Sequence, residues 1–174
     1  MRVLTLYASA HGSTAEVAHF IADAWQKRSI DTTVAAVGSI QSLAGYDAYA
    51  LGSAIHHGLW LPEMATFVRR SGRALADKPV YLWLTCLRAI ESDGFAYVTN
   101  NYLPNLLSRA VSFRRIGIFA GKVDVAALNP EEAWTLTFRY DGSKGLPALS
   151  GDHRDWKLIR AWAEQVAADL EATA

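Results

Sequence analysis

The chain starts with a short apolar segment that breaks into a polar loop, Leu4-Thr-Leu-Tyr-Ala-Ser-Ala-His-Gly-Ser-Thr14, and runs directly into Ala15-Glu-Val-Ala-His-Phe-Ile-Ala-Asp-Ala-Trp25. The pattern predicts a strand, a loop and a helix in succession. The first amide groups of a helix have no intrahelical partner, and they form a ready binding site for a phosphate. The loop consists of Ser9, Ala10, His11, Gly12, Ser13 and Thr14, and the expected donors to the phosphate are its backbone amides and the hydroxyls of Ser9, Ser13 and Thr14.

This loop contains no cation, because no Lys or Arg occurs between Val3 and Gln26. A P-loop would need a lysine here. The dinucleotide fingerprint would need three glycines at fixed offsets, and the turn has only Gly12. Both classes of nucleotide site are therefore excluded. What remains is one terminal phosphate bound by hydroxyls and backbone amides, as in a mononucleotide site.

Composition limits the classes of protein that remain. A chain of 174 residues, 51% of them hydrophobic, can bury a core as a single domain over 1–174. The single cysteine, Cys86, excludes a disulfide framework and favours a reducing, cytoplasmic location. No apolar run has the length of a membrane span. Lys plus Arg equals Asp plus Glu at 17 each, which offers no long-range attraction for nucleic acid.

Segments of strand length alternate with segments of helix length along the chain, which predicts a parallel sheet covered by helices on both faces. The expected fold is α/β, a doubly wound five-stranded sheet of order 2-1-3-4-5. The expected strands are 3–8, 32–37, 48–52, 80–85 and 115–120, and the expected helices are 15–25, 62–72, 95–109 with an interruption at Pro104, and 156–170.

The ligand site of such a fold lies at the carboxyl ends of the strands, beside the switch point between the first and third strands. The phosphate loop already lies there. The loops after the third and fourth strands, Gly52–Trp60 and Thr85–Asp93, are expected to converge on it.

These residues carry a family resemblance. Ser9–Thr14 resembles the phosphate loop of flavodoxins, and Tyr46–Ser53 resembles the third strand of that family. Within the family, the chain is most similar to the branch that includes menaquinone-dependent protoporphyrinogen oxidase, through Gly52–Gly58, Ile118–Gly121 and the pair Asp155-Trp156.

The resemblance implies that FMN binds noncovalently, with its phosphate in the first loop and its isoalloxazine ring between the second and third loops. Since the flavin would carry the redox chemistry, no catalytic protein residue is assigned. The cofactor-binding residues beyond the first loop are then Ser53, Ala54, Ile55, His56, His57, Gly58 and Trp60 in the second, and Thr85, Cys86, Leu87, Arg88 and Ala89 in the third.

Several of these residues have a second interpretation. His56 and His57 could ligate a metal, but adjacent histidines in an extended loop point apart, so no metal site is predicted. Trp60 either stacks on the ring or anchors the following helix. Arg88 lies either beside the pyrimidine edge of the ring or in solvent, and Cys86 is expected to be packing.

The chain departs from this branch in an insert at about 122–151, after the fifth strand. The resemblance implies an insert rich in arginine and tyrosine, whereas this one has few basic residues, which argues against porphyrinogen oxidation. Asn129-Pro130 followed by two glutamates favours a helix start. An alternating pattern typical of a strand is formed by Trp134, Leu136, Phe138 and Tyr140. Of the two interpretations we favour the helix. The stretch 142–147 is expected to be a loop or lid.

The predicted function is an FMN-dependent oxidoreductase that passes electrons to a quinone-like or other small organic acceptor. Zero net charge argues against the alternative, a strongly acidic electron carrier for a protein partner. A cofactor-free binding domain is the third alternative, and a homodimer through 122–150 is left open. A flat acceptor would suit the apolar rim expected at Leu59, Trp60, Leu61, Phe95 and Tyr97.

Overall fold

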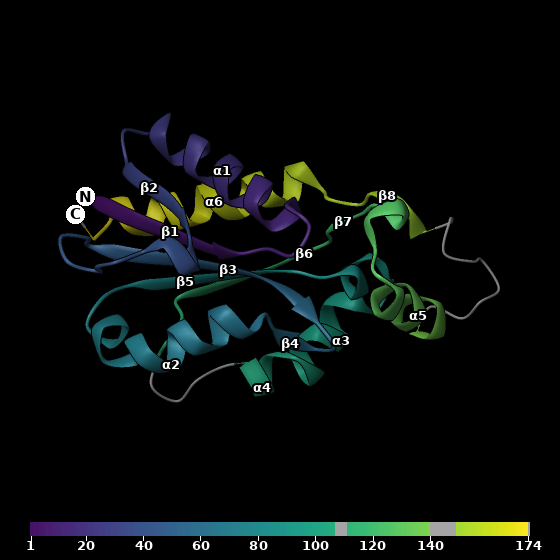
Figure 1. The fold of residues 1–174 in the computed structure, drawn as a ribbon. Helices are drawn as coiled ribbons and strands as arrows, with labels where there is room; N and C mark the ends of the chain where they lie inside the picture. The colour runs from purple at the N-terminus through teal and green to yellow at the C-terminus, as the bar shows by residue number, and fades with distance from the viewer. Residues whose placement is uncertain (107–110, 140–148, 174) are drawn as a thin grey trace.

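The structure is a computed structural model that describes residues 1–106, 111–139 and 149–173. Its main sheet has the predicted topology, with parallel strands in the order β2-β1-β3-β5-β6. Two helices cover one face and three cover the other (Figure 1). The strands are β1 (Arg2–Ala8), β2 (Asp31–Ala36), β3 (Ala48–His56), β5 (Val80–Thr85) and β6 (Arg115–Phe119), and the helices are α1 (Ser13–Gln26) and α6 (Trp156–Glu171) on one face and α2 (Pro62–Ala76), α3 (Gly94–Asn101) and α4 (Leu103–Leu106) on the other.

Alternation along the strands divides the core into two layers, because successive side chains point to opposite faces of a sheet. Leu4 and Leu6 of β1 pack in the layer under α2, whereas Val3 packs in the layer under α1 and α6. Gly52 of β3 is required by this packing. A Cβ at Gly52 would lie 2.0 Å from the indole ring of Trp83, which is fully buried.

The second predicted loop is different in the structure. β3 continues to His56 and turns back into β4 (Leu59–Trp60), which pairs with it antiparallel. The two turn residues, His57 and Gly58, both have positive φ, at 53° and 78°. Positive φ at both central residues is what a tight two-residue hairpin requires. The prediction that the third strand ends at Gly52 was therefore wrong.

Pro104 divides the third predicted helix, as expected. α3 ends at Asn101 and α4 begins at Leu103, since proline lacks an amide hydrogen and clashes with the preceding turn. Short 3-10 turns follow β2 at Val37–Ser39 and β5 at Leu87–Ile90. Among the helices of the described residues, none is long and apolar enough to cross a bilayer.

The insert is closed at its base by a two-stranded sheet that the sequence did not predict, formed by β7 (Lys122–Val123) and β8 (Gly151–Asp152). A 3-10 turn at Val125–Ala127 leads to α5 (Pro130–Arg139), which confirms the helix over the strand. A reciprocal cap explains this outcome. Asn129 Oδ1 accepts from the Glu132 amide at 2.9 Å, and Glu132 Oε2 accepts from the Asn129 amide at 3.0 Å. The predicted loop or lid at 142–147 lies outside the described residues.

Candidate functional site

A cavity of ≈ 160 Å³ lies at the carboxyl ends of the sheet strands, where the three loops were expected to converge. It opens between the loop after β1, the β3–β4 hairpin, the turn after β5 and the insert. The predicted residues that line it are Ala10, His11 and Ser13 from the first loop, Ala54, Ile55, His56, His57 and Gly58 from the second, and Thr85, Cys86, Leu87 and Arg88 from the third.

The phosphate loop has the features of an anion site. Gly12 precedes α1 in the left-handed conformation, with φ 86°, and no side chain caps the helix. A Cβ at Gly12 would meet nothing within 4 Å, so the loop is open there. The Ser9 hydroxyl oxygen is buried and has no hydrogen-bond partner among the described residues. A buried hydroxyl of this kind calls for a bonding partner, and a phosphate oxygen would suit it.

Thr14 makes a contact within the protein that the sequence did not predict. Its hydroxyl is fully buried and lies 2.6 Å from the hydroxyl of Thr85 at the end of β5. This bond joins the first and third loops beneath the cavity. Thr14 is therefore not among the cavity-lining residues, although Thr85 is.

Ser53 and Trp60 also lie away from the cavity. The Ser53 hydroxyl is buried, donates to the Ala54 carbonyl and accepts from the Leu61 amide, which braces the hairpin. Trp60 is only 7% exposed and packs edge-on against Phe113. Of the two interpretations of Trp60, the structure supports the anchor, because β4 pairs the tryptophan with Ile55 immediately before α2 begins. Ala89 packs against the core beside them and does not line the cavity.

Arg88 is held at the cavity by neighbouring side chains of the same loop and of α3. Its guanidinium donates to both carboxylate oxygens of Asp93 at 2.7 Å, lies 3.6 Å from Glu91 and stacks over the Tyr97 ring at 4.3 Å. The side chain lines the cavity with its charge already paired.

Cys86 is buried at the floor of the cavity. Burial raises the pKa of its thiol to about 11. The group is therefore a neutral thiol at physiological pH, in agreement with a packing role.

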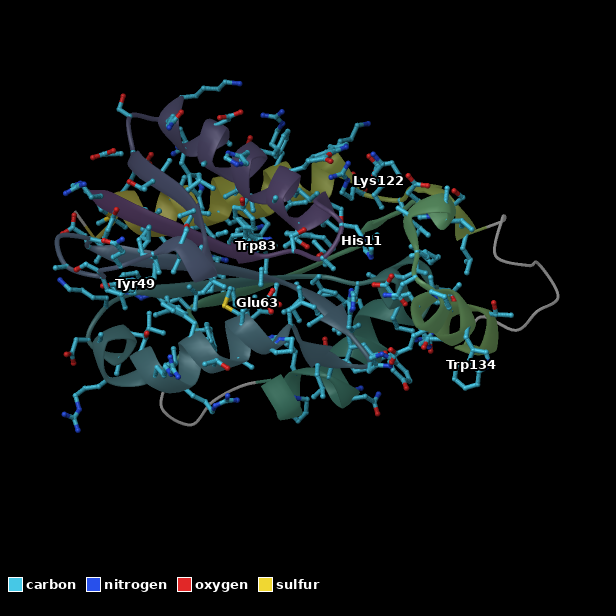
Figure 2. All side chains as sticks on the ribbon, viewed as in Figure 1. His11, Tyr49, Glu63, Trp83, Lys122 and Trp134 are labelled. Atoms are coloured by element: carbon cyan, nitrogen blue, oxygen red, sulfur yellow. The ribbon has the colours of Figure 1, made fainter. Side chains whose placement is uncertain are left out.

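The insert supplies one wall of the cavity that sequence reasoning missed. Three of its lining residues are charged, Lys122 on β7, Asp124 just after it and Glu132 on α5, and Figure 2 shows Lys122 at the same end of the molecule as His11. The expectation of a site without cations is thus incomplete. The further lining residues are Tyr102, Gly121, Lys122, Val123, Asp124, Leu128, Glu132, Thr135 and Leu136.

A contact between the phosphate loop and α5 crosses this cavity. His11 Nε2 lies 2.8 Å from Glu132 Oε1. Burial alone would raise the pKa of the Glu132 carboxyl, but hydrogen bonds from the Asn129 amide and His11 together hold it below its usual value. The carboxylate is therefore ionised and held in place at the edge of the phosphate loop.

His56 faces the same group from the hairpin. Burial lowers the pKa of its imidazole, against the opposing attraction of Glu132. His56 is thus a neutral imidazole at physiological pH. Within the described residues, no three His, Cys, Asp or Glu side chains gather in an arrangement that could hold a metal ion.

The apolar rim is smaller than predicted. Phe95 and Leu59 are 66% and 54% exposed, and Tyr97 is also exposed, whereas Trp60 and Leu61 are in the core. The prediction that Trp60 and Leu61 belong to this rim was wrong, because the β4 strand buries them against β3 and α2.

The phosphate-type loop, the sheet order and the cavity at the switch point together point to one family, and its sequence model for a flavodoxin domain matches residues 4–146. The chain belongs to the flavodoxin-domain family. This flavodoxin-domain protein is 23% identical over 177 residues to the Escherichia coli K12 protein named protoporphyrinogen IX dehydrogenase [quinone], and the match covers 96% of this chain and 95% of the relative.

Solved structures agree on the fold of this flavodoxin-domain protein. A flavodoxin from Streptococcus pneumoniae TIGR4 superposes with a TM-score of 0.58 at 16% identity, covering 97% of this chain and 99% of that one. The rubredoxin oxygen:oxidoreductase of Desulfovibrio gigas superposes with a TM-score of 0.60 at 14% identity over 98% of this chain. This chain spans only 36% of the length of that larger protein.

Proposed function

We propose that this protein is an FMN-dependent oxidoreductase that passes electrons to a quinone-like or other small organic acceptor. The observation that carries the proposal is the buried Ser9 hydroxyl, which has no partner among the described residues and belongs to the uncapped loop whose Ala10, His11 and Ser13 line the cavity. Membership of the flavodoxin-domain family supports the same cofactor.

The residues present fit FMN at both ends. The loop from Ser9 to Ser13 and the start of α1 would bind the phosphate, and the hairpin at Ala54–Gly58 with the turn at Cys86–Arg88 would hold the ring. When bound, FMN would supply both hydride and single-electron transfer.

The protein side chains would set the surroundings of this chemistry. Apolar groups at Ile55, Leu128 and Leu136 line the cavity and would exclude water from it. Neutral His56 and ionised Glu132 place one negative charge near the phosphate loop. No proton transfer is assigned to them, because a quinone can take its two protons from solvent.

Two features support a small acceptor over a protein partner. The net charge is zero, which gives no electrostatic steering toward a basic redox protein. Leu59, Phe95 and Tyr97 are exposed apolar residues of β4 and α3, and these two elements lie at the end of the sheet where β3 ends (Figure 1). The single cysteine and the small-molecule chemistry also lead us to propose a cytoplasmic location.

The test has two stages. Titration of the purified chain with FMN, followed by absorbance and flavin fluorescence, is expected to show saturable binding of one FMN per chain. The dithionite-reduced complex is then mixed anaerobically with a soluble naphthoquinone or with cytochrome c. Rapid reoxidation by the quinone alone supports the proposal. Reoxidation by cytochrome c alone would favour the carrier, and failure to bind FMN would favour the cofactor-free domain.

Protoporphyrinogen oxidation is the second candidate, and the 23% identical relative over nearly the full chain is the observation in its favour. The few basic residues of the insert argue against it. Fluorescence of protoporphyrin, measured after adding protoporphyrinogen and the naphthoquinone to the FMN complex, separates the two. Porphyrin formation above that of a protein-free control would establish this activity.

A further inference from the structure

One buried cation lies behind the phosphate loop, on a residue that sequence reasoning did not associate with it. The Arg154 side chain is only 2% exposed. Its Nη1 donates to the Ser13 carbonyl at 3.2 Å, and its Nη2 donates to Glu16 Oε2 at 2.7 Å. The guanidinium thus meets the first turn of α1 from the far end of the sequence.

Arg154 is fixed on its other side by β8 and α6. Its Nε and Nη2 donate to the two carboxylate oxygens of Asp152 at 2.7 and 2.6 Å, and it stacks on the Trp156 ring at 4.4 Å. The hydrogen bond from Arg154 lowers the pKa of the Asp152 carboxyl to about 2, so the pair stays charged at physiological pH. A buried guanidinium is costly unless such acceptors surround it.

The same network reaches the wall of the cavity. Asp152 pairs in register with Lys122 of β7, which lines the cavity, and the His153 amide donates to the Gly121 carbonyl at 3.1 Å. Arg154 therefore joins the phosphate loop to both ends of the insert.

The charges around Arg154 indicate how its hydrogen-bond network would affect an anionic ligand. Glu16 is the acidic residue in the first turn of α1, close to where a phosphate would bind. The Glu16 carboxylate would repel a phosphate at this position. Arg154 forms an ion pair with this carboxylate and so reduces the repulsion. The hydrogen bond to the Ser13 carbonyl also orients the peptide groups whose amides start the helix.

We propose that Arg154 is a positioning residue for the phosphate end of the cofactor site. It holds the loop and the first turn of α1 in the conformation that binds a phosphate monoester, and it neutralises Glu16. This rests on the proposed function. The role is specific to the phosphate, so it predicts a larger effect on FMN than on riboflavin, which has the same ring and no phosphate.

The experiment measures dissociation constants for FMN and riboflavin by flavin fluorescence. Arg154→Gln is expected to weaken FMN binding by about tenfold, the scale of one lost hydrogen bond to a charged group, and to leave riboflavin binding unchanged. Arg154→Lys keeps the charge and one donor, so it is expected to recover part of the loss.

The matched control is Arg115→Gln. Arg115 also makes a two-pronged ion pair, with Asp169 between β6 and α6, but it does not line the cavity. Its ratio of FMN to riboflavin affinity should equal that of the unmodified protein. If Arg154→Gln does not fold, the ratio for Arg154→Lys decides alone.

Each outcome has one meaning. An unchanged ratio in the Arg154 variants, or an equal loss for both ligands, would overturn the positioning role while leaving the proposed function intact. An unmodified protein that binds neither ligand would end both proposals. Unmodified protein that binds riboflavin as tightly as FMN would show that the phosphate loop, and hence Arg154, contributes nothing to cofactor binding.

Discussion

The loops after β1, β3 and β5 are held by the buried sheet, whereas the insert meets them through a few partly exposed polar contacts. Thr14 and Thr85 bond to each other, Ser53 bonds within the hairpin, and all three are buried. On the opposite wall, α5 reaches the phosphate loop through the hydrogen bond between His11 and Glu132. We therefore expect the cavity wall formed by the loops after β1, β3 and β5 to keep its conformation whenever the core is folded. The wall formed by the insert should depend on contacts that can be lost at a small cost in stability.

The largest expected effect lies on the sheet side, at Gly52. Replacing Gly52 by Ala places a Cβ 2.0 Å from the Trp83 ring, which the packed core cannot easily move. We expect a loss of about 3 kcal/mol in the free energy of unfolding, measured by urea denaturation. Gly38→Ala is the control, since a Cβ there meets nothing within 4 Å and should change stability by no more than about 0.5 kcal/mol. Equal effects at both glycines would contradict the close packing.

The reactivity of the Cys86 thiol tests how well the loops held by the sheet bury the floor of the cavity. The pKa of the Cys86 thiol is raised from 9.0 to about 11 by burial, so its thiolate fraction near neutral pH is about 100-fold below that of an ordinary thiol. A disulfide reagent should modify Cys86 at least that much more slowly in the native protein than in urea. Rapid modification of the native protein would show that the cavity floor is open.

The bond between Thr14 and Thr85 sharpens the comparison, because it joins two of the sheet-side loops. Thr14→Val leaves the buried Thr85 hydroxyl without its partner and should cost about 2 kcal/mol. The double variant with Thr85→Val removes both hydroxyls and should cost less than the sum of the single changes. Strict additivity in urea denaturation would mean that the two hydroxyls do not interact.

The smallest effect is expected at the insert. Glu132→Gln removes the charge from a partly exposed hydrogen bond to His11, so the loss of stability near neutral pH should stay below about 1 kcal/mol. The folded-state pKa of Glu132 is lowered from 4.5, so its contribution is fully present above pH 4.5 and is lost as the pH falls through the folded value. Urea denaturation at several pH values should show a shallower acid decline in the variant. A loss as large as that of Gly52→Ala would show that the insert is part of the core.

Much of the fold followed from local patterns. The strand order, the break at Pro104 and the choice of a helix over a strand at 130–139 were all predicted. The extension of β3 into a hairpin was missed, because His57-Gly58 is not one of the residue pairs, such as Asn-Gly or Asp-Gly, that mark a two-residue turn. The sequence left two interpretations of Trp60 open, and only the pairing of β4 with β3 decided for the anchor.

The candidate site was predicted in part for the same reason. Loops that follow parallel strands must meet at one edge of the sheet. The sequence alone therefore grouped the lining residues of the three loops, which include Ala10, Ile55 and Arg88. Nothing local marks Glu132 as the partner of His11, which lies 121 positions earlier. Its pairing with Asn129 was visible only as the start of a helix.

The amino-acid order alone determined the layers, the strand sequence and the position of the phosphate loop, because periodic burial and the start of a helix are properties of neighbouring residues. Only the tertiary structure placed Arg154 behind that loop and Glu132 and Lys122 beside it. These charges come from segments whose positions depend on how the insert and α6 pack onto the finished sheet, and no spacing along the chain encodes that packing.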